Sequence, residues 1–474
     1  MMRLGENLVD GKWVRASGPE RMALNPATRE PLAKVQFGTI ADIDAAVAAA
    51  HRAFPSWSAT PLEHRAAILY RLRDGLRDCA EQFANIIATE VGSPLWFTRR
   101  IGMTMPIRNV ELAAEGAEEL FAERRAGTSV ILREPYGVVA AITPWNAPVH
   151  QIVAKVAAAL AAGCTLVLKP SEIAAQTARL FAEIMLNTGV PDGVFNMVIG
   201  GADVGQALAS HPLVDVVSFT GSVEVGRQVA ASAAGGVKKV LLELGGKSAT
   251  IVLPDADLEK AAEVVLALCL ANSGQVCVAQ SRLLVPRELL AKAEQLLVSG
   301  TGSWTIGSPT DEAARLGPVA TAQQYERVRH FIRRGIEEGA KLVAGGPEEV
   351  AGLAGYYVRP TIFSEVTSDM AIAQEEIFGP VLVVMPYDTV DEAIEIANSV
   401  SLGLSGGVWS RDTERAQDVA RRMRTGQVAI NGSPQNLETP FGGYKQSGYG
   451  RENGKYGVEE FLQYKAIHGA VTAI

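Results

Sequence analysis

The sequence predicts an α/β protein built around two parallel β-sheets, and two observations lead to this prediction. From Ala141 to Gly246 short apolar strands alternate with helical stretches, and a second alternating region runs from Ala249 to about Ile430. Such alternation is typical of parallel sheets with helices on both faces. The chain has 474 residues, enough for two or three domains, because domains usually have about 100–200 residues.

Helices and one extended segment precede the first alternating region. Turn signals at Asp10-Gly11-Lys12 and Asn25-Pro26-Ala27 separate short apolar pieces near the N-terminus. Periodicity then predicts helices, rich in Ala, Leu, Glu and Arg, at residues 40–47, 62–76, 80–91 and 106–122. Residues 124–139 are β-branched and alternating, with Gly and Pro turns, and predict a protruding ribbon of extended strands.

The two alternating regions supply the predicted sheets. In the first, strands are expected at residues 138–143, 165–170, 194–199, 214–221 and 238–244, with helices at 149–162, 174–186, 204–211 and 223–233. In the second, strands are expected at 248–253, 281–286, 381–387, 406–410 and 426–430, with helices at 258–270, 288–297, 323–338, 390–398 and 413–424. The final stretch, Phe461–Ile474, predicts an unpaired strand whose exposed edge another subunit would cover.

Composition narrows the class of protein. A net charge of −8 argues against a nucleic-acid binder, which normally has a basic face. The N-terminus lacks the pattern of a signal peptide, and the longest uncharged apolar stretch, Val156–Leu168, is too short to span a bilayer. The four cysteines and six histidines are scattered, which favours neither a disulfide scaffold nor a metal site. We therefore expect a cytoplasmic protein that binds small molecules, with no metal and no membrane partner.

Polar residues follow several of the predicted strands. They form the clusters Thr143–Asn146, Lys169–Glu172, Thr220–Ser222 and Glu243–Lys247. Parallel sheets bind ligands beyond the carboxyl ends of their strands, so these clusters mark a candidate binding crevice. No G-x-G-x-x-G follows any of the strands. Ser222 and nearby amides are placed to meet a phosphate at a helix N-terminus, or simply to form a tight turn with a good N-cap. Lys169 and Glu172 fit either ribose binding or a surface charge pair.

Three further residues are candidates for chemistry. Asn146, beside Trp145 and between two prolines, either caps the next helix or donates to a developing oxyanion. Glu243 ends an apolar strand, where a carboxylate is costly unless it is paired or serves as a general base. Cys277 lies in a turn after Gly274 and is either an inert thiol or a nucleophile, whereas Cys79, Cys164 and Cys269 lie in apolar elements and are interpreted as packing.

Taken together and in order, these stretches resemble the aldehyde dehydrogenase superfamily over essentially the whole chain. The matching segments are "ITPWNAP", "LKPSE", "FTGSVEVG", "LELGGKSATIV", "GQVCVAQSR", "EEIFGPV" and "PFGGYKQSGYGRE". The resemblance implies a Rossmann-like cofactor domain at residues 1–117 and 137–245. It also implies a second α/β catalytic domain at 246–446 and a small β oligomerisation element at 118–136 and 455–474.

The resemblance implies a catalytic role for five residues. Cys277 would be the nucleophile that attacks an aldehyde, with the oxyanion held by the Asn146 amide and the Cys277 backbone N–H. Glu243 would activate the water that hydrolyses the resulting thioester. Lys155 and Glu452 match a proton-relay pair.

The resemblance also implies NAD as cofactor, with NADP possible, since Glu172 would repel the 2′-phosphate of NADP. Lys169 and Glu172 match adenosine-ribose contacts, Ser222 a pyrophosphate contact, and Glu376 with Phe378 the nicotinamide-ribose side. The full set of expected cofactor-binding residues is Ile142, Thr143, Pro144, Trp145, Lys169, Ser171, Glu172, Phe219, Gly221, Ser222, Leu244, Glu376 and Phe378. The ribbon and the C-terminal strand match the family's oligomerisation element, which implies a homodimer or homotetramer.

The retained Glu243 favours hydrolysis to a free acid, because relatives that transfer the acyl group to coenzyme A lack this base. A CoA-acylating semialdehyde dehydrogenase is the main alternative. A binding protein that keeps the fold is disfavoured because Cys277 and Glu243 are both present, and a Cys-His hydrolase because the matched motifs contain no histidine. In relatives that act on small aldehydes, certain positions beside the motifs are often aromatic. Here these positions are Ala147, Ala154 and Ala271, with Gln151 and Gln435 nearby. They suggest a wide, partly polar tunnel and a bulky or aromatic aldehyde substrate.

Overall fold

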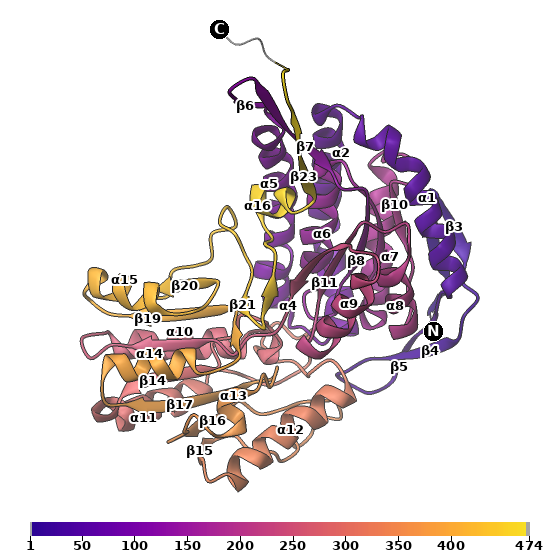
Figure 1. Cartoon of the computed structure of the whole chain (residues 1–474). Helices are drawn as coiled ribbons and strands as arrows, with labels where there is room; N and C mark the ends of the chain where they lie inside the picture. Colours follow the sequence, from indigo (N-terminus) through magenta and orange to yellow (C-terminus); the bar gives the residue numbers. More distant parts are fainter. Residues whose placement is uncertain (1, 471–474) are drawn as a thin grey trace.

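The computed structural model describes residues 2–470, and its largest element is an eight-stranded sheet (Figure 1). The strands lie in the order β22 (Gly448–Tyr449), β12 (Lys239–Glu243), β11 (Val216–Thr220), β8 (Val138–Ile142), β9 (Thr165–Lys169), β10 (Phe195–Met197), β2 (Glu6–Val9) and β3 (Lys12–Arg15). The five strands from β12 to β10 are parallel, as predicted. The antiparallel strands at the two edges were not predicted.

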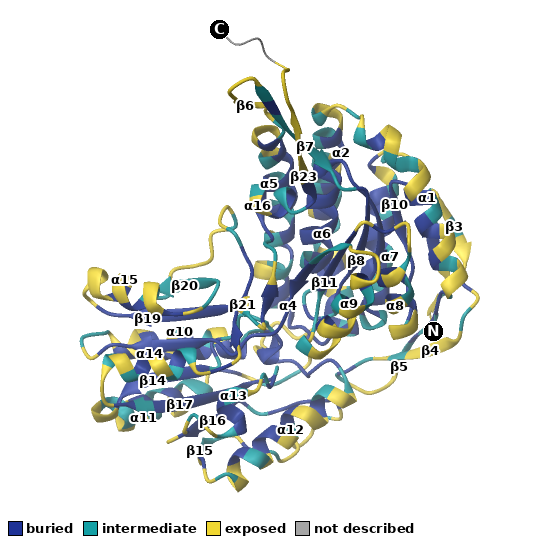
Figure 2. Ribbon diagram, in the orientation of Figure 1, coloured by how far each residue is buried: buried dark blue, intermediate teal, exposed yellow. Residues whose placement is uncertain are grey.

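Strand β8 shows why this sheet is buried on both faces. Val138 and Ala140 belong to one apolar core, and Val139 and Ala141 belong to another on the opposite face. Side chains alternate between faces along a strand, so both faces need a cover of helices. One face is covered by α1 (Ile40–Ser58), α8 (Ala202–Ser210) and α9 (Val223–Ala234), and the other by α2 (Leu62–Asp78), α3 (Ala80–Glu90), α5 (Thr104–Phe121), α6 (Pro148–Ala162) and α7 (Ala175–Asn187). Figure 2 shows the strands as the most buried part of this half.

Local sequence sets several element boundaries. Thr39 and Asp42 form a capping box that starts α1, which continues through Pro55 to Ser58, well beyond the predicted end at Val47. Gly163, with a φ of 90°, ends α6 in the left-handed conformation that glycine adopts readily. Asp10 and Gly11 both have positive φ, so the predicted turn there is a tight hairpin between β2 and β3.

The second sheet has seven strands, parallel except for β15. Their order is β15 (Lys341–Ala344), β16 (Thr361–Ser364), β17 (Val381–Tyr387), β14 (Arg282–Pro286), β13 (Ala249–Val252), β19 (Ser405–Trp409) and β20 (Gln427–Ile430). Strands β15 and β16 were not predicted. One face packs against α10 (Leu258–Leu270) and α11 (Leu290–Thr301), and the other against α12 (Ala322–Glu337), α13 (Ala371–Gln374), α14 (Val390–Asn398) and α15 (Thr413–Arg422).

A third, three-stranded sheet projects from the first half beside the C-terminus (Figure 1). It contains β6 (Arg124–Ala126), β7 (Ser129–Pro135) and β23 (Leu462–Ile467), all antiparallel. The prediction of an unpaired C-terminal strand is therefore wrong for 462–467, because β23 pairs with β7 of its own chain along six residue pairs. The outer edge of β23 has no partner among the described residues. Residues 471–474 of the predicted stretch lie outside the described range.

Smaller elements complete the chain. β1 (Met2–Leu4), β5 (Pro31–Gln36) and β4 (Glu20–Leu24) form a small sheet, and β18 (Leu402–Gly403) pairs with β21 (Tyr444–Lys445). The short helix α16 (Gly454–Glu459) packs against α5, and the short helix α4 (Leu95–Phe97) contacts α3 and leads into a π-helix at Thr98–Gly102. Within residues 2–470, no helix combines the length and the apolar character needed to cross a bilayer.

Candidate active site

The predicted crevice residues lie along one edge of the eight-stranded sheet. Strands β12, β11, β8 and β9 are adjacent and parallel, so their carboxyl ends meet at the same edge. Glu243 is the last residue of β12, and the segments after the other three strands carry Gly221, Asn146 and Ser171. The fold thus brings together polar groups that are up to about a hundred residues apart in the sequence, at the place where such sheets bind ligands.

The residues expected to bind adenosine and pyrophosphate lie at two helix starts. Lys169 is buried and its Nζ lies 3.8 Å from Glu172 Oε2, while the Glu172 side chain is 43% exposed. Burial lowers the pKa of Lys169, and the charges of Glu172 and Asp203 oppose this shift. Ser222 accepts a hydrogen bond from Val225 N at 3.3 Å, so it caps α9. Capping and phosphate binding are compatible, because the other first-turn amides remain available.

The remaining residues of the first sheet fit a dinucleotide in different ways. The hydroxyls of Thr143 and Thr220 are buried at strand ends without a hydrogen-bond partner among the described residues. Buried hydroxyls left unpaired are costly, so a ligand with polar atoms would stabilise them. Ile142, Phe219 and Leu244, by contrast, pack in the apolar core below these strand ends. Their side chains are buried in that core, so they do not supply polar contacts.

Glu376 and Phe378 reach the crevice from the second half of the chain. Glu376 Oε1 accepts a hydrogen bond from Gly246 N at 3.1 Å, and a Cβ on Gly245 would lie 2.0 Å from Glu376 Oε2. Burial raises the pKa of Glu376 to about 7. Phe378, in a left-handed conformation, packs edge-on against Trp145 with ring centroids 5.8 Å apart. These contacts join the two halves across the crevice.

The segment before Cys277 has an unusual backbone. Asn272, Ser273 and Gly274 have φ values of 50°, 57° and 75°, so three successive residues are left-handed. Non-glycine residues adopt this conformation only where the surroundings hold them there, and such residues concentrate at functional sites. Asn272 Nδ2 donates to Asn146 O at 2.9 Å and Ser273 Oγ to Gly317 O at 2.8 Å. The loop is therefore fixed by both halves of the molecule.

Asn146 does not cap the next helix, so that interpretation is wrong. The N-cap of α6 is Ala147, without a side-chain cap, and Asn146 Nδ2 donates instead to Gln275 O at 3.0 Å. Asn146 is buried against the segment that leads to Cys277. A side-chain amide carries two N–H donors, so one remains beyond the bond to Gln275.

Cys277 is half-buried, and its carbonyl lies close to Gly246, where a Cβ would approach it to 2.6 Å. Desolvation raises the pKa of the Cys277 thiol to about 12, and the carboxyl groups of Glu376, Glu243 and Glu452 add to this. The free protein therefore keeps this thiol protonated at neutral pH. Cys164 and Cys269 are fully buried, in line with packing roles, and Cys79 is half-buried.

This raised pKa predicts how Cys277 reacts in protein without cofactor. Only the thiolate reacts with iodoacetamide, so alkylation should become about tenfold faster per pH unit through about pH 10, whereas an ordinary thiol levels off near its pKa of about 8.5. The rate is measured by mass spectrometry of the peptide that contains Cys277, with glutathione in the same solution as control. A plateau that coincides with that of glutathione would contradict the predicted shift.

Glu243 is buried at the end of β12, with 5% exposure, and neither carboxyl oxygen has a hydrogen-bond partner among the described residues. Burial raises its pKa well above the ordinary value, and the nearby charge of Glu452 adds to this. The alternative of a structural salt bridge is wrong, since no lysine or arginine pairs with it there. A buried, unpaired carboxyl group beside a cysteine has the properties of a general base whose active form increases with pH.

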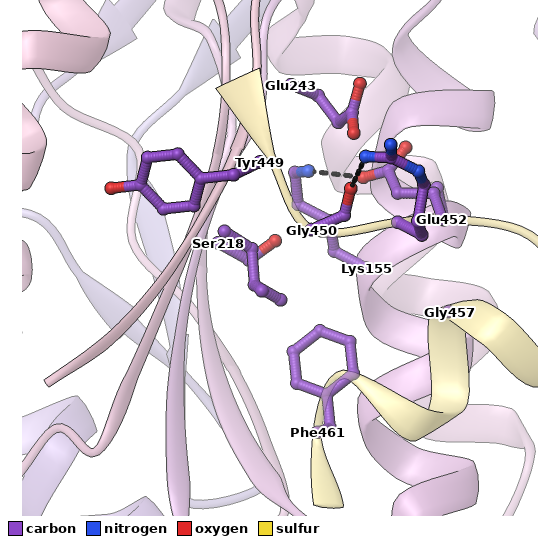
Figure 3. Close-up of a pocket in the computed structure, with 11 residues that line it drawn as sticks. Lys155, Ser218, Glu243, Tyr449, Gly450, Glu452, Gly457 and Phe461 are labelled. Atoms are coloured by element: carbon purple, nitrogen blue, oxygen red, sulfur yellow. Dashed lines mark hydrogen bonds and ion pairs between the residues drawn. The ribbon is translucent and has the colours of Figure 1, made fainter. Parts of the chain in front are cut away.

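Lys155 and Glu452 form a buried ion pair beside Glu243 (Figure 3). Lys155 Nζ lies 2.7 Å from Glu452 Oε1, and the two side chains are 1% and 11% exposed. Both residues and Glu243 line one small cavity, with room of about 10 Å³ for the centre of a water molecule. The structure thus brings this predicted pair together with the predicted base.

One titratable residue near the site was not singled out from the sequence. His150 lies on α6, half-buried, with Nδ1 lacking a partner among the described residues. Burial lowers its pKa, with opposing effects of Glu452 and Lys155, so it lies within electrostatic range of that pair. Nothing in the sequence marks it, because a single histidine on an apolar helix is ordinarily part of the packing.

The residues expected to line a substrate tunnel differ in how far they are buried. Ala154 and Gln151 are buried on α6, and Gln151 Oε1 has no partner among the described residues. Ala147 and Ala271 are half-buried, whereas Gln435 is exposed. The small residues on α6 leave room next to Lys155, and Gln151 adds an unpaired acceptor.

A parallel sheet whose carboxyl edge carries unpaired hydroxyls and a buried carboxyl group defines the class, an α/β enzyme of the nucleotide-binding type. The model of the aldehyde dehydrogenase family matches residues 13–467, so the chain belongs to that family. It is 47% identical over 473 residues to 3-succinoylsemialdehyde-pyridine dehydrogenase of a Pseudomonas species, covering 98% of each chain.

Solved structures agree with this assignment. A cysteine-to-alanine mutant of aldehyde dehydrogenase C from Pseudomonas syringae, in complex with NAD+ and octanal, is 46% identical with a TM-score of 0.98, over 99% of this chain and 98% of the other. The NAD+ complex of the Mycobacterium tuberculosis aldehyde dehydrogenase is 40% identical with a TM-score of 0.95, over 98% of each chain. The predicted fold and the prediction of an NAD-dependent aldehyde dehydrogenase are confirmed.

Proposed function

We propose that this chain oxidises an aldehyde to the free carboxylic acid through a thioester on Cys277, which a water molecule activated by Glu243 hydrolyses. The observation that carries this proposal is the position of Glu243. This carboxyl group is buried, unpaired and electrostatically coupled to Cys277, and it shares a water-sized cavity with Lys155 and Glu452. A cysteine with only a packing role would not need a buried, unpaired carboxyl group nearby.

In the first half-reaction the Cys277 thiol gives up its proton to solvent and Sγ forms a bond to the aldehyde carbon. The developing oxyanion is stabilised by the second N–H of Asn146 and by the backbone N–H of Cys277. Asn146 is held in position by its bond to Gln275 O, so it needs no reorganisation during the reaction. NAD+, when bound, accepts the hydride and contributes a positive charge that favours the thiolate. Loss of hydride from the former aldehyde carbon leaves the thioester on Cys277.

In the second half-reaction a water molecule adds to the thioester carbon and Glu243 takes its proton. The pKa of Glu243 is raised, so the group is neutral below that pKa and becomes a base only as the pH rises through it. Hydrolysis should therefore become faster as the pH rises through this raised pKa. The Glu452 carboxylate, paired with Lys155, then receives the proton from Glu243, a transfer supported by the cavity that all three residues line.

The residues at the sheet edge fit NAD better than NADP. Glu172 is partly exposed beside Lys169 at the end of β9, where it is expected to meet the adenosine ribose. Its charge would repel a 2′-phosphate. The unpaired hydroxyls of Thr143 and Thr220 supply further polar contacts for the cofactor.

A spectrophotometric screen tests this proposal. We expect NADH formation from aldehydes with NAD+, slower turnover with NADP+, and no dependence on coenzyme A. The alternative, a CoA-acylating semialdehyde dehydrogenase, would need coenzyme A for turnover. A binding protein with this fold would give no NADH under any condition.

We further propose a bulky or aromatic aldehyde as substrate. The small side chains of Ala147, Ala154 and Ala271 leave space near the site, and the similar structures and relatives include enzymes named for, or bound to, long or aromatic aldehydes. In the same screen, kcat/KM for octanal or an aromatic aldehyde should exceed that for acetaldehyde. An equal or higher value for acetaldehyde would contradict this substrate class.

We propose that the chain forms a homodimer or homotetramer. The outer edge of β23 presents unpaired backbone groups, and its residues from Gln463 to Ile467 are exposed. Pairing with a neighbouring subunit would satisfy these groups and cover the edge. Sedimentation velocity at micromolar concentration should show a dimer or tetramer, and a monomer there would contradict this assembly.

The four cysteines are all free in the structure, including the two fully buried ones. Free thiols persist in reducing compartments, which supports the cytoplasm as the place where this enzyme acts. A reactive nucleophile such as Cys277 also depends on such an environment, because oxidation would inactivate it.

A further inference from the structure

Behind Glu243 the structure contains two small cavities that adjoin each other. The first is lined by Lys155, Glu243 and Glu452, and the second lies between α5, α6 and α16. Each has room of about 10 Å³ for the centre of a water molecule, which is roughly the space that one buried water needs. Ala154 and Gly457 line both cavities, so only small side chains separate them.

The second cavity contains a pair of asparagines with unused hydrogen-bonding groups. Asn109 Nδ2 donates to Asn453 Oδ1 at 3.1 Å. This bond leaves Asn109 Oδ1 and Asn453 Nδ2 without partners among the described residues, although the two side chains are only 4% and 6% exposed. An acceptor and a donor that line the same water-sized space would both be satisfied by one water molecule.

The rest of this second cavity is apolar. Ala113, Val153, Ala157 and Ala158 line it, so they offer no competing partner for the two amides. Leaving Asn109 Oδ1 and Asn453 Nδ2 unpaired in such surroundings is costly, and packing alone would favour Leu or Val at these positions. Asn453 directly follows Glu452 and has a φ of 73°, a conformation that turns the backbone sharply between the two side chains.

Hydrolysis of the thioester leaves a proton on Glu243, and the two cavities behind this residue offer a route by which that proton could leave. When water adds to the thioester, a C–O bond forms, the C–S bond breaks with its electron pair leaving on Cys277, and the abstracted proton is left on Glu243. Glu243 is 5% exposed, and bound substrate and cofactor would occupy the crevice in front of it. The proton therefore needs a path behind it, through groups that can exchange protons.

We propose that Asn109 and Asn453 hold a second water site, which extends the path from Glu243 past Lys155 and Glu452 and lets the proton leave the active site away from the crevice. The proton passes from Glu243 to water in the first cavity, then to the Glu452 carboxylate, and from there to the water at the asparagine pair. Lys155 remains an ammonium throughout, so one proton leaves along this path per turnover, and the Cys277 thiolate regains from solvent the proton that the thiol lost in the first half-reaction. This inference rests on the proposed hydrolytic function and makes the two asparagines positioning residues.

Two variants test this water site. Asn109→Leu keeps the volume but removes the acceptor, and Ala157→Val fills the cavity. In both, the NADH burst should keep its rate and amplitude, because acylation does not use this path. The rate at which the acyl-enzyme disappears in a single turnover is measured by quenching samples for mass spectrometry. We expect this rate to fall about tenfold, a smaller loss than the 10²–10⁴-fold typical of removing a general base itself. The solvent deuterium isotope effect on this step should rise.

Two further variants serve as controls. Ala161→Val lies one turn later on α6, is equally buried and lines neither cavity, so its deacylation rate should match the wild type. Asn109→Ser keeps a hydroxyl and leaves room for an additional water, so it should restore most of the rate. If Asn109→Leu does not fold, Ala157→Val and Asn109→Ser still decide the question.

Other outcomes separate this water site from the proposed function. Unchanged deacylation in both Asn109→Leu and Ala157→Val would overturn the water site. The water site would also be overturned if the burst and the deacylation rate fell by the same factor, or if Ala161→Val slowed deacylation as much as Ala157→Val. Either result would indicate an effect of packing alone. Absence of any acyl-enzyme in the mass spectra of the wild-type single turnover would instead overturn the proposed thioester mechanism.

Discussion

Cys277→Ala should reduce NADH formation on the order of 10⁴–10⁶-fold, the loss seen when a nucleophile that acts with its partners is removed. The structure supports a large effect because no other thiol can substitute. Cys269 is fully buried on α10, and Cys164 is buried beside β9. The measurements are the initial rate and the burst of NADH absorbance with a good aldehyde substrate, and both should be lost.

The control for this prediction is Cys79→Ala, because Cys79 is half-buried like Cys277 but lies between α2 and α3, away from the crevice. Its activity should be retained. Titration calorimetry should give the Cys277→Ala variant an unchanged affinity for NAD+, since the sheet edge is intact. Turnover that survives in the Cys277→Ala variant would remove this residue from the mechanism.

Glu243→Gln should allow the first half-reaction and block the second. Glutamine has the shape of the acid but cannot take a proton from water, so each active site should release a single equivalent of NADH and then stop. Steady-state turnover should fall about 10²–10⁴-fold. Rapid mixing measures the burst, and intact mass spectrometry should show the enzyme with an added acyl group.

Chemical rescue provides the control for the Glu243→Gln variant. Hydroxylamine cleaves thioesters without a general base, so adding it to the acylated variant after the aldehyde has been removed should release the acyl group and allow a second burst. A variant without a burst would show that Glu243 acts before the thioester forms, and unchanged steady-state turnover would exclude it from hydrolysis altogether.

The parallel core of both sheets could be predicted from the sequence. Short apolar strands that alternate with helices are compatible with few arrangements other than a parallel sheet. Helices α10 and α14 were predicted with the bounds that the structure shows, since each begins at a clear N-cap, Asp257 and Thr389. Strands β2 and β3 were missed. They are short and mix polar with apolar residues, so only the Asp10-Gly11 turn marked them.

At the site, residue types were easier to predict than contacts. The ends of β8, β9, β11 and β12 were recognisable, so the crevice itself was predictable. The bond from Asn146 to Gln275 O joins residues 129 positions apart and leaves no local pattern. The left-handed run at Asn272 and Ser273 was also hidden, because these residues adopt that conformation only under tertiary constraint.

The ion pair between Lys155 and Glu452 also has a consequence for biosynthesis, because the two residues are 297 positions apart. At about 5–20 residues per second, a ribosome adds Glu452 roughly 15–60 s after Lys155. During that interval α6 carries a lysine whose buried position has no counter-charge, and β7 lacks its partner β23. The first half of a nascent chain can thus assemble its nucleotide-binding sheet early. The Lys155–Glu452 pair and the β7–β23 pairing can form only after the last segments of the chain have been made, so pulse-labelled translation should show them as late contacts.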